Sequence, residues 1–376
     1  MNLKNLYISA GVLAIVAIIT SFLKTTDSAP LQDEREQGPI VDETKLGEAA
    51  QVRITGSDGV VTIVKNDEDS NWIVKERYDM PVSYSKLSNQ VKSVVEANIQ
   101  RLVTTNPERI ESLGFDSDES ISFLDKDGEE IVSIELGRQT DSGRQFFRYK
   151  GEDKAFLASA TFRIDDDGDS WLAKRLVDAK QDDIRSVSVN FQNGGEIAFS
   201  RDNKDSDWTT GTTLEGKVVD DGAVDRMANR FPNLTFTKTA AKDDELVSAA
   251  QENSHSVSLT FEDDKTISYK IGRRPEVKVM KEVEVDGEDG EKKTEMQEEV
   301  ETEAGPVYVF IDSSSSEDPI NEYMSKAAFE VSAYQYTSIP ESVEALFKDA
   351  PPPPEPEESV DDSETSASAG VLESAQ

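Results

Sequence analysis

The acidic run RIDDDGDSW at positions 163–171 holds the residue types that could bind a metal ion. Closely spaced carboxylates followed by a glycine are typical of EF-hand calcium loops. Aligned on its glycine, such a loop would begin at Arg163 and end at Lys174, where acidic oxygen donors are required. The run is therefore interpreted as an acidic turn in which Asp169 or Ser170 caps a following helix, with a nonstandard ion site as the alternative.

The other reactive side chains form no recognisable catalytic arrangement. The single histidine, His255, precedes VSLTF and has the parity of its apolar residues, which predicts a core-facing position at a strand edge. No serine, histidine and aspartate order stands out, and the glycines at 57–61 and 194–196 indicate hairpin turns rather than phosphate loops. With 76 acidic residues, neighbouring carboxylates are expected by chance. The sequence therefore assigns no catalytic, cofactor-binding or metal-binding residue and predicts no enzymatic activity.

The charge balance restricts the possible partners. The 376 residues include 76 Asp and Glu against 40 Lys and Arg, a formal net charge of −36. Such a field repels phosphate backbones, so nucleic acid is not an expected partner. The chain contains no cysteine, which excludes disulfides, thiolate catalysis and cysteine-based metal sites.

A hydrophobic segment at Leu6–Leu23 predicts contact with membrane lipid. Its eighteen residues carry no charge, and Lys4 and Lys24 flank it. As a helix it would span about 27 Å, close to the hydrocarbon core of a bilayer. An uncleaved transmembrane helix is the main interpretation and a cleaved signal peptide the alternative. We expect a single-pass protein of a bacterial-type inner membrane with its bulk outside the cytoplasm.

Two stretches of the chain are near copies. SIELGR at 133–138 is echoed by SYKIGR at 268–273, and Trp72 is echoed by Trp208, in each case about 135 residues later. Both copies alternate apolar and polar residues around glycine-containing turns, which predicts antiparallel hairpins. We therefore predict an α+β fold of two tandem repeated modules, each an antiparallel sheet with helices, preceded by one N-terminal transmembrane helix.

Within the echoes, the apolar residues are expected to face the core, each glycine to sit where the chain turns, and each arginine to brace the turn or contact a ligand. These residues are Ile134, Leu136, Gly137 and Arg138 in the first copy and Tyr269, Ile271, Gly272 and Arg273 in the second. Helical spacing predicts helices at 87–102, after Asp220 or Asp221, at 171–179 and at 321–331.

The motifs of the first copy resemble a known family. Trp72, Leu113-Gly114-Phe115, Leu136-Gly137 and Tyr149 are similar to the domain of unknown function 4340 family (DUF4340), over roughly 52–179 and more weakly to about 334. The second copy lacks the Leu-Gly-Phe segment. The resemblance implies an anchored, extracytoplasmic accessory subunit of the kind encoded beside ABC-type transporters for gliding motility or export. It carries over no catalytic residues.

These patterns together predict an order of segments. We expect a cytoplasmic N-terminus at 1–5, the anchor at 6–23, a tether at 24–48, the first module at 49–182, the second module at 183–347 and a disordered Pro-rich acidic tail at 348–376. The second module contains an acidic insertion at 275–304, which indicates either a protruding hairpin or disorder. It is either a tolerated loop or an arm that contacts a basic partner surface.

Three functions follow in order of preference. The first is a non-enzymatic scaffold for a membrane-protein partner, such as an ABC-type transporter or envelope complex. The second is an extracytoplasmic ligand-binding protein with a cleft between the modules, and the third is a carboxylate-based hydrolase.

Overall fold

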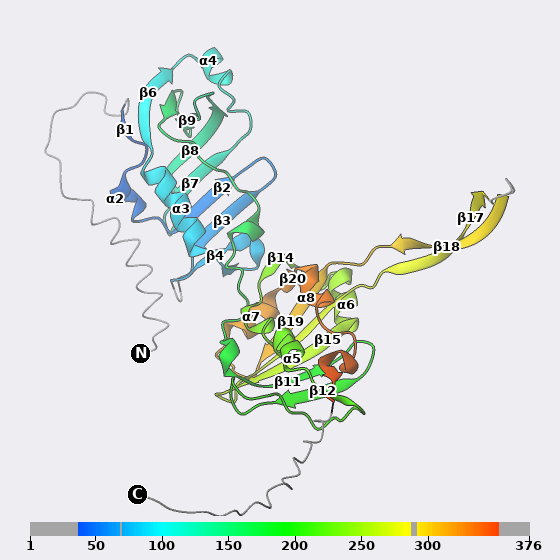
Figure 1. The fold of residues 1–376 in the computed structure, drawn as a ribbon. Helices are drawn as coiled ribbons and strands as arrows, with labels where there is room; N and C mark the ends of the chain where they lie inside the picture. Colours follow the sequence, from blue (N-terminus) through cyan, green and yellow to red (C-terminus); the bar gives the residue numbers. More distant parts are fainter. Residues whose placement is uncertain (1–36, 68–69, 287–291, 353–376) are drawn as a thin grey trace, which may run out of the picture.

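The computed structural model describes residues 37–67, 70–286 and 292–352 (Figure 1). The predicted N-terminus and anchor at 1–23 lie outside these residues, as do most of the tether and of the C-terminal tail. Among the described residues, no helix is both long enough and apolar enough to cross a membrane.

The first sheet contains ten strands, all paired antiparallel to their neighbours, in the order β1-β6-β10-β9-β8-β7-β2-β3-β4-β5. The strands are β1 (Gly38–Pro39), β2 (Gln51–Thr55), β3 (Val60–Lys65), β4 (Trp72–Val74), β5 (Met80–Pro81), β6 (Asn98–Thr104), β7 (Ser120–Leu124), β8 (Glu130–Gln139), β9 (Gln145–Tyr149) and β10 (Ala155–Ala158).

The second sheet has seven strands in the order β14-β20-β19-β16-β15-β11-β12. They are β11 (Ile184–Asn190), β12 (Glu196–Ser200), β14 (Phe236–Ala240), β15 (Ser254–Phe261), β16 (Thr266–Arg273), β19 (Val307–Ser313) and β20 (Ala328–Val331). This order reproduces β6-β10-β9-β8-β7-β2-β3 of the first sheet strand for strand. SIELGR and SYKIGR thus occupy the same place, in β8 and β16.

The fold class predicted from the sequence is wrong, because extended sheets dominate the described chain and its helices are short. The helices are α2 (Glu43–Leu46), α3 (Tyr84–Val95), α4 (Pro107–Glu111), α5 (Asp221–Ala228), α6 (Glu245–Glu252), α7 (Pro319–Lys326) and α8 (Ala333–Thr337). No described helix supplies the transmembrane part of that prediction.

Tertiary hydrogen bonds explain why three predicted helices are shortened or absent. The helix predicted at 321–331 ends at Lys326, because 328–331 form β20 and pair with β14 and β19. Asn98 and Leu102 lie in β6, where they pair with β1 and β10 instead of extending α3. The segment 171–179 follows a short 3-10 turn, Gly168–Trp171, and is extended where it passes between the sheets. Sheet pairing thus overrides the helical spacing of these residues.

Each sheet buries one face under a helix, α3 in the first module and α5 in the second (Figure 1). The predicted core-facing residues of the echoes are confirmed: Ile134, Leu136, Tyr269 and Ile271 are at most 1% exposed. Asp220 caps α5 by accepting a hydrogen bond from the Ala223 amide, as predicted.

Gly137 and Gly272 do not lie at turns, contrary to the prediction. They lie inside β8 and β16, where a Cβ atom would stand 2.6 Å from the Leu113 carbonyl oxygen and 2.1 Å from that of Ala250. Glycine therefore lets the segment after α4, or the end of α6, contact the second face of each sheet.

The acidic insertion forms a separate two-stranded ribbon, β17 (Val277–Asp286) and β18 (Lys292–Thr302). In the chain it lies between β16 and β19, and it projects away from the body of the protein (Figure 1). A further small sheet pairs β13 (Lys217–Val219) with β21 (Phe347–Asp349).

Candidate functional site

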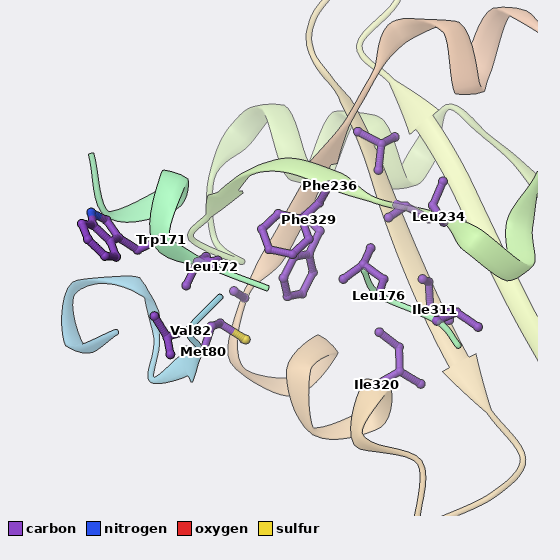
Figure 2. Packing of buried hydrophobic residues seen from close by; sticks show 14 of the residues in the cluster. Met80, Val82, Trp171, Leu172, Leu176, Leu234, Phe236, Ile311, Ile320 and Phe329 are labelled. Carbon is purple, nitrogen blue, oxygen red and sulfur yellow. The ribbon is translucent and has the colours of Figure 1, made fainter. Parts of the chain in front are cut away.

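The junction between the two sheets is filled by apolar side chains (Figure 2). The linker, residues 171–179, crosses it with Trp171 and Leu172 at most 2% exposed. Phe236 of β14 packs against Phe329 of β20 with their ring centroids 4.9 Å apart. Met80, at the edge of the first sheet, is 2% exposed. The core is thus continuous from one sheet to the other.

Backbone hydrogen bonds bind the linker to both sheets. The Ala173 amide donates to the Pro81 carbonyl in β5, and the Leu176 amide donates to the Leu234 carbonyl just before β14. The extended linker therefore acts as a shared strand segment at the border, which explains why it does not form the predicted helix.

Asp169 of the acidic run joins the two modules directly. Asp169 is 7% exposed. One of its carboxylate oxygens accepts a hydrogen bond at 2.9 Å from the Nε atom of Arg77, which belongs to the first module. Its other oxygen accepts from the Thr239 backbone amide and hydroxyl, both at 2.8 Å, in β14 of the second module. We call Arg77, Asp169 and Thr239 the Asp169 bridge.

The neighbouring carboxylates of the run also have protein partners. Asp166 accepts from the backbone amides of Asp58 at 2.8 Å and Gly59 at 3.1 Å. Asp165 accepts from the Lys86 ammonium, and although burial raises the pKa of Asp165, the hydrogen bonds from Lys86 and Ser170 lower it below its usual value. The run is thus a structural turn that joins the β2–β3 hairpin, helix α3 and the junction.

The predicted cap is corrected in detail. Asp167, rather than Asp169 or Ser170, caps the turn, by accepting from the Asp169 amide at 3.0 Å, and the capped element is a 3-10 turn. Among the described residues, no group of three or more His, Cys, Asp or Glu side chains is arranged to hold a metal ion.

His255 occupies the core-facing position predicted for it, at 5% exposed. Its Nδ1 atom accepts from the Gln192 backbone amide at 3.3 Å, and its ring centroid lies 5.1 Å from that of Tyr336. Burial lowers the pKa of His255, although Glu341 opposes the shift, so the imidazole is favoured in its neutral form. These contacts give the side chain a packing role at the strand edge.

The two arginines of the echoes lie over aromatic rings. The Arg138 guanidinium is 5.9 Å from the centre of Phe146, and that of Arg273 is 5.1 Å from the centre of Tyr336. Each follows a glycine inside a strand, so neither stands at the turn where the sequence placed it.

Two hollows lie on the described surface. One, of about 360 Å³, lies where the end of the linker, near Asp178 and Lys180, meets the turn between β15 and β16, at Glu262 and Lys265, and its lining is mainly charged. The other, of about 180 Å³, lies on the polar face of the first sheet beside Phe115. There the Ser122 and Ser133 hydroxyls are 2.8 Å apart, and Ser258 and Ser268 repeat this pair, also at 2.8 Å, in the second sheet.

Sequence reasoning missed the Asp169 bridge. The run was visible as acidic, but the pairing of Asp169 with Arg77 and Thr239 joins residues 92 and 70 positions away. Local sequence offers no signal for such contacts, because they depend on how the two modules pack.

The fold and this junction define a two-module antiparallel β protein whose halves share one core and from which an acidic ribbon projects. Residues 72–254 match the model of the family described as Domain of unknown function (DUF4340). The matched span starts at β4, crosses the linker and ends at the start of β15, so it includes the linker and the Asp169 bridge but not Phe329 of β20. No match was found among curated proteins or among solved structures.

Proposed function

We propose that the protein is a non-enzymatic accessory protein that holds a partner protein at the outer surface of a bacterial-type inner membrane. An ABC-type transporter or another envelope complex is the proposed class of partner. The observation that carries this proposal is the closed junction, in which the linker and the Asp169 bridge join two sheets into one body. A body joined in this way holds its outer surfaces, including the ribbon, in a fixed arrangement, as a positioning protein requires.

Membrane association is proposed on separate grounds. The uncharged segment Leu6–Leu23 supports contact with lipid, and the resemblance noted above supports a transporter as partner. Placement outside the cytoplasm agrees with the acidic surface, which keeps a large domain soluble beside a membrane.

The two alternative functions find less support. A ligand cleft between the modules would need the space that Trp171, Leu172 and Phe329 fill. A carboxylate-based hydrolase would need acidic groups directed at a substrate, whereas the carboxylates of Asp165, Asp166 and Asp169 accept hydrogen bonds from the protein itself.

Affinity purification from native membranes tests the proposal. The tagged full chain is solubilised in mild detergent and its companions are identified by mass spectrometry, with a variant lacking 6–23 as the matched control. We expect a membrane protein in stoichiometric amount with the full chain and much less with the control. Recovery of no such partner, together with hydrolysis of ester, glycoside or peptide substrates by the purified protein, would refute the proposal.

A further inference from the structure

We propose that the β17–β18 ribbon is a docking arm whose apolar face binds a partner protein bearing an apolar strip between lysine or arginine side chains. The inference rests on the proposed function and deepens it, because it identifies the surface that binds the partner and the chemistry of the partner's matching surface.

The arm is fixed at its base and unsupported along its length. At the base, the Gly305 amide donates to the Arg274 carbonyl at 2.9 Å, and the Arg274 guanidinium donates to the Glu303 carbonyl at 3.2 Å. Beyond the base, β17 and β18 pair with each other as a sheet of two strands. An isolated two-stranded hairpin is marginally stable in water, so a partner surface against one face would stabilise the arm.

The register places three of the four exposed apolar side chains in the described part of the arm on one face; the fourth, Val277, lies at the base beside a register shift. Residues paired across an antiparallel ribbon share a face, and alternate pairs lie on the same side. The pairs on this face are Lys278 with Val300, Met280 with Glu298, and Glu282 with Met296. Met280 is therefore diagonal to both Met296 and Val300, and the three form a continuous apolar line.

These three side chains are unusually exposed for their type. Met280 and Met296 are each 54% exposed and Val300 is 43% exposed. Methionine is flexible and polarizable, which suits a surface that adapts to a partner. A contiguous exposed apolar surface rimmed by polar residues is typical of an interaction site.

The opposite face of the arm differs in character. There the Lys281 ammonium forms an ion pair with Glu299 at 2.7 Å, and Val279 is half-buried. The face with Met280 also carries an ion pair, between Lys278 and Glu298 at 3.5 Å, so ion pairing does not distinguish the two faces. Apolar exposure does, because Met280 and Met296 are each 54% exposed whereas Val279 is half-buried, and the face with Met280 is therefore the one we assign to the partner.

Charge determines the chemistry of the partner. The segment 276–303 contains twelve acidic residues and four lysines, a net of −8, and Glu282 and Glu298 border the apolar line. A basic rim on the partner would be attracted to this arm and would speed association. A second copy of the chain is a poor occupant, because each copy carries a net charge of −36.

Site-specific photocrosslinking in the full chain tests the inference. A photoreactive residue replaces Met280 and, as matched control on the opposite face, Lys281, and adducts formed in native membranes are mapped by mass spectrometry. We expect several-fold more adduct from position 280, on a partner segment in which apolar residues lie beside Lys or Arg. Equal adducts from both positions, or an adduct to a second copy, would overturn the inference.

Binding to the identified partner gives the second measurement. Met280→Ser with Met296→Ser should weaken binding about ten- to hundred-fold, from the apolar area lost. Glu282→Gln with Glu298→Gln should weaken it less and flatten its dependence on salt. Unchanged affinity in both variants, with circular dichroism showing an intact fold, contradicts the docking arm.

Deleting 276–303 separates the inference from the proposed function. The deletion leaves Pro275 and Ala304 as ends, and their neighbours Arg274 and Gly305 are already hydrogen-bonded, so a short glycine turn can close the gap. Loss of the partner from this variant supports the arm. If the deletion variant recovers the same partner as the full chain, the arm is wrong and the accessory function stands; if the full chain recovers none, the accessory function itself fails.

Discussion

Replacing Asp169 by Asn should weaken the junction strongly while preserving the shape of the side chain. The asparagine oxygen can still accept from Thr239, but its NH₂ group would face the Arg77 Nε–H, which is also a donor. The bridge would lose one charge-assisted hydrogen bond, worth about 1.5–3 kcal/mol, and leave the Nε–H of a partly buried guanidinium without its acceptor, while Nη1 still donates to the Glu76 carbonyl. Because the Arg77 side chain remains 31% exposed, water recovers part of this loss, and we expect about 2–3 kcal/mol.

Urea unfolding followed by tryptophan fluorescence and circular dichroism measures this change. Trp171 is fully buried at the junction and reports its opening. With an m-value of about 2–3 kcal/mol/M, the midpoint should fall by about 1 M. Asp167→Asn is the matched control: its carboxylate lies 3.7 Å from the Arg77 Nη2 atom, but the Asp167 side chain is 60% exposed, where an ion pair contributes little, and Asn is an equally good cap. Its midpoint should therefore stay within about 0.2 M of the parent. Equal midpoints for the two variants would refute the bridge as the element that joins the modules.

Three further changes test the cores and the buried histidine. Tyr269→Phe removes a buried hydroxyl that has no hydrogen-bond partner among the described residues. Its thermal unfolding should show a gain in stability of about 1 kcal/mol, or 2–4 °C in Tm. A loss of stability of similar size would mean that the hydroxyl does have a hydrogen-bond partner. Gly272→Ala should lower the free energy of chemical unfolding by about 1–3 kcal/mol, because the new Cβ atom meets the Ala250 carbonyl oxygen. Gly211→Ala is the control and should leave stability unchanged, because the space around Gly211 is open. A larger loss from Gly211→Ala than from Gly272→Ala would contradict the close approach. Burial lowers the pKa of His255, so its contribution to the free energy of unfolding is complete above its unfolded pKa of about 6.5 and is lost as pH falls from there through the lower folded pKa. The free energies of unfolding of the parent and of His255→Gln, measured between pH 7.5 and about 5, should therefore converge at the acidic end. A constant difference between the two proteins over this range would exclude the linkage.

Alternation of apolar and polar residues was enough to predict the central strands of the repeat, whereas β6 and β20 fall in segments predicted as helices. β15 is buried at every second residue, including His255, as its parity indicated. The equivalence of SIELGR and SYKIGR likewise corresponds to a shared strand order, because side-chain period two is a local property of the backbone. The insertion, for which hairpin and disorder were both open, is a ribbon over its described residues.

Local spacing was misleading where long-range pairing decides the backbone. WLAKRLVDA has the composition of a helix, yet its amides bond to Pro81 and Leu234 on two different modules. Gly137 has the sequence context of a turn, but its position reflects the approach of the Leu113 carbonyl, 2.6 Å from where its Cβ would be. The local sequence of neither segment indicates the distant carbonyl groups that determine its backbone conformation.

The sequence by itself determined the acidic character of the chain, the absence of cysteine, the duplicated hairpins and the inward side of their strands, since these depend on composition and on neighbours a few residues apart. The tertiary structure alone decided that the halves share a core, that Asp169 joins them, and that Met280, Met296 and Val300 line one face of a projecting arm. Each of these follows from burial and register between residues distant in the chain, where the free energy of packing outweighs local preference.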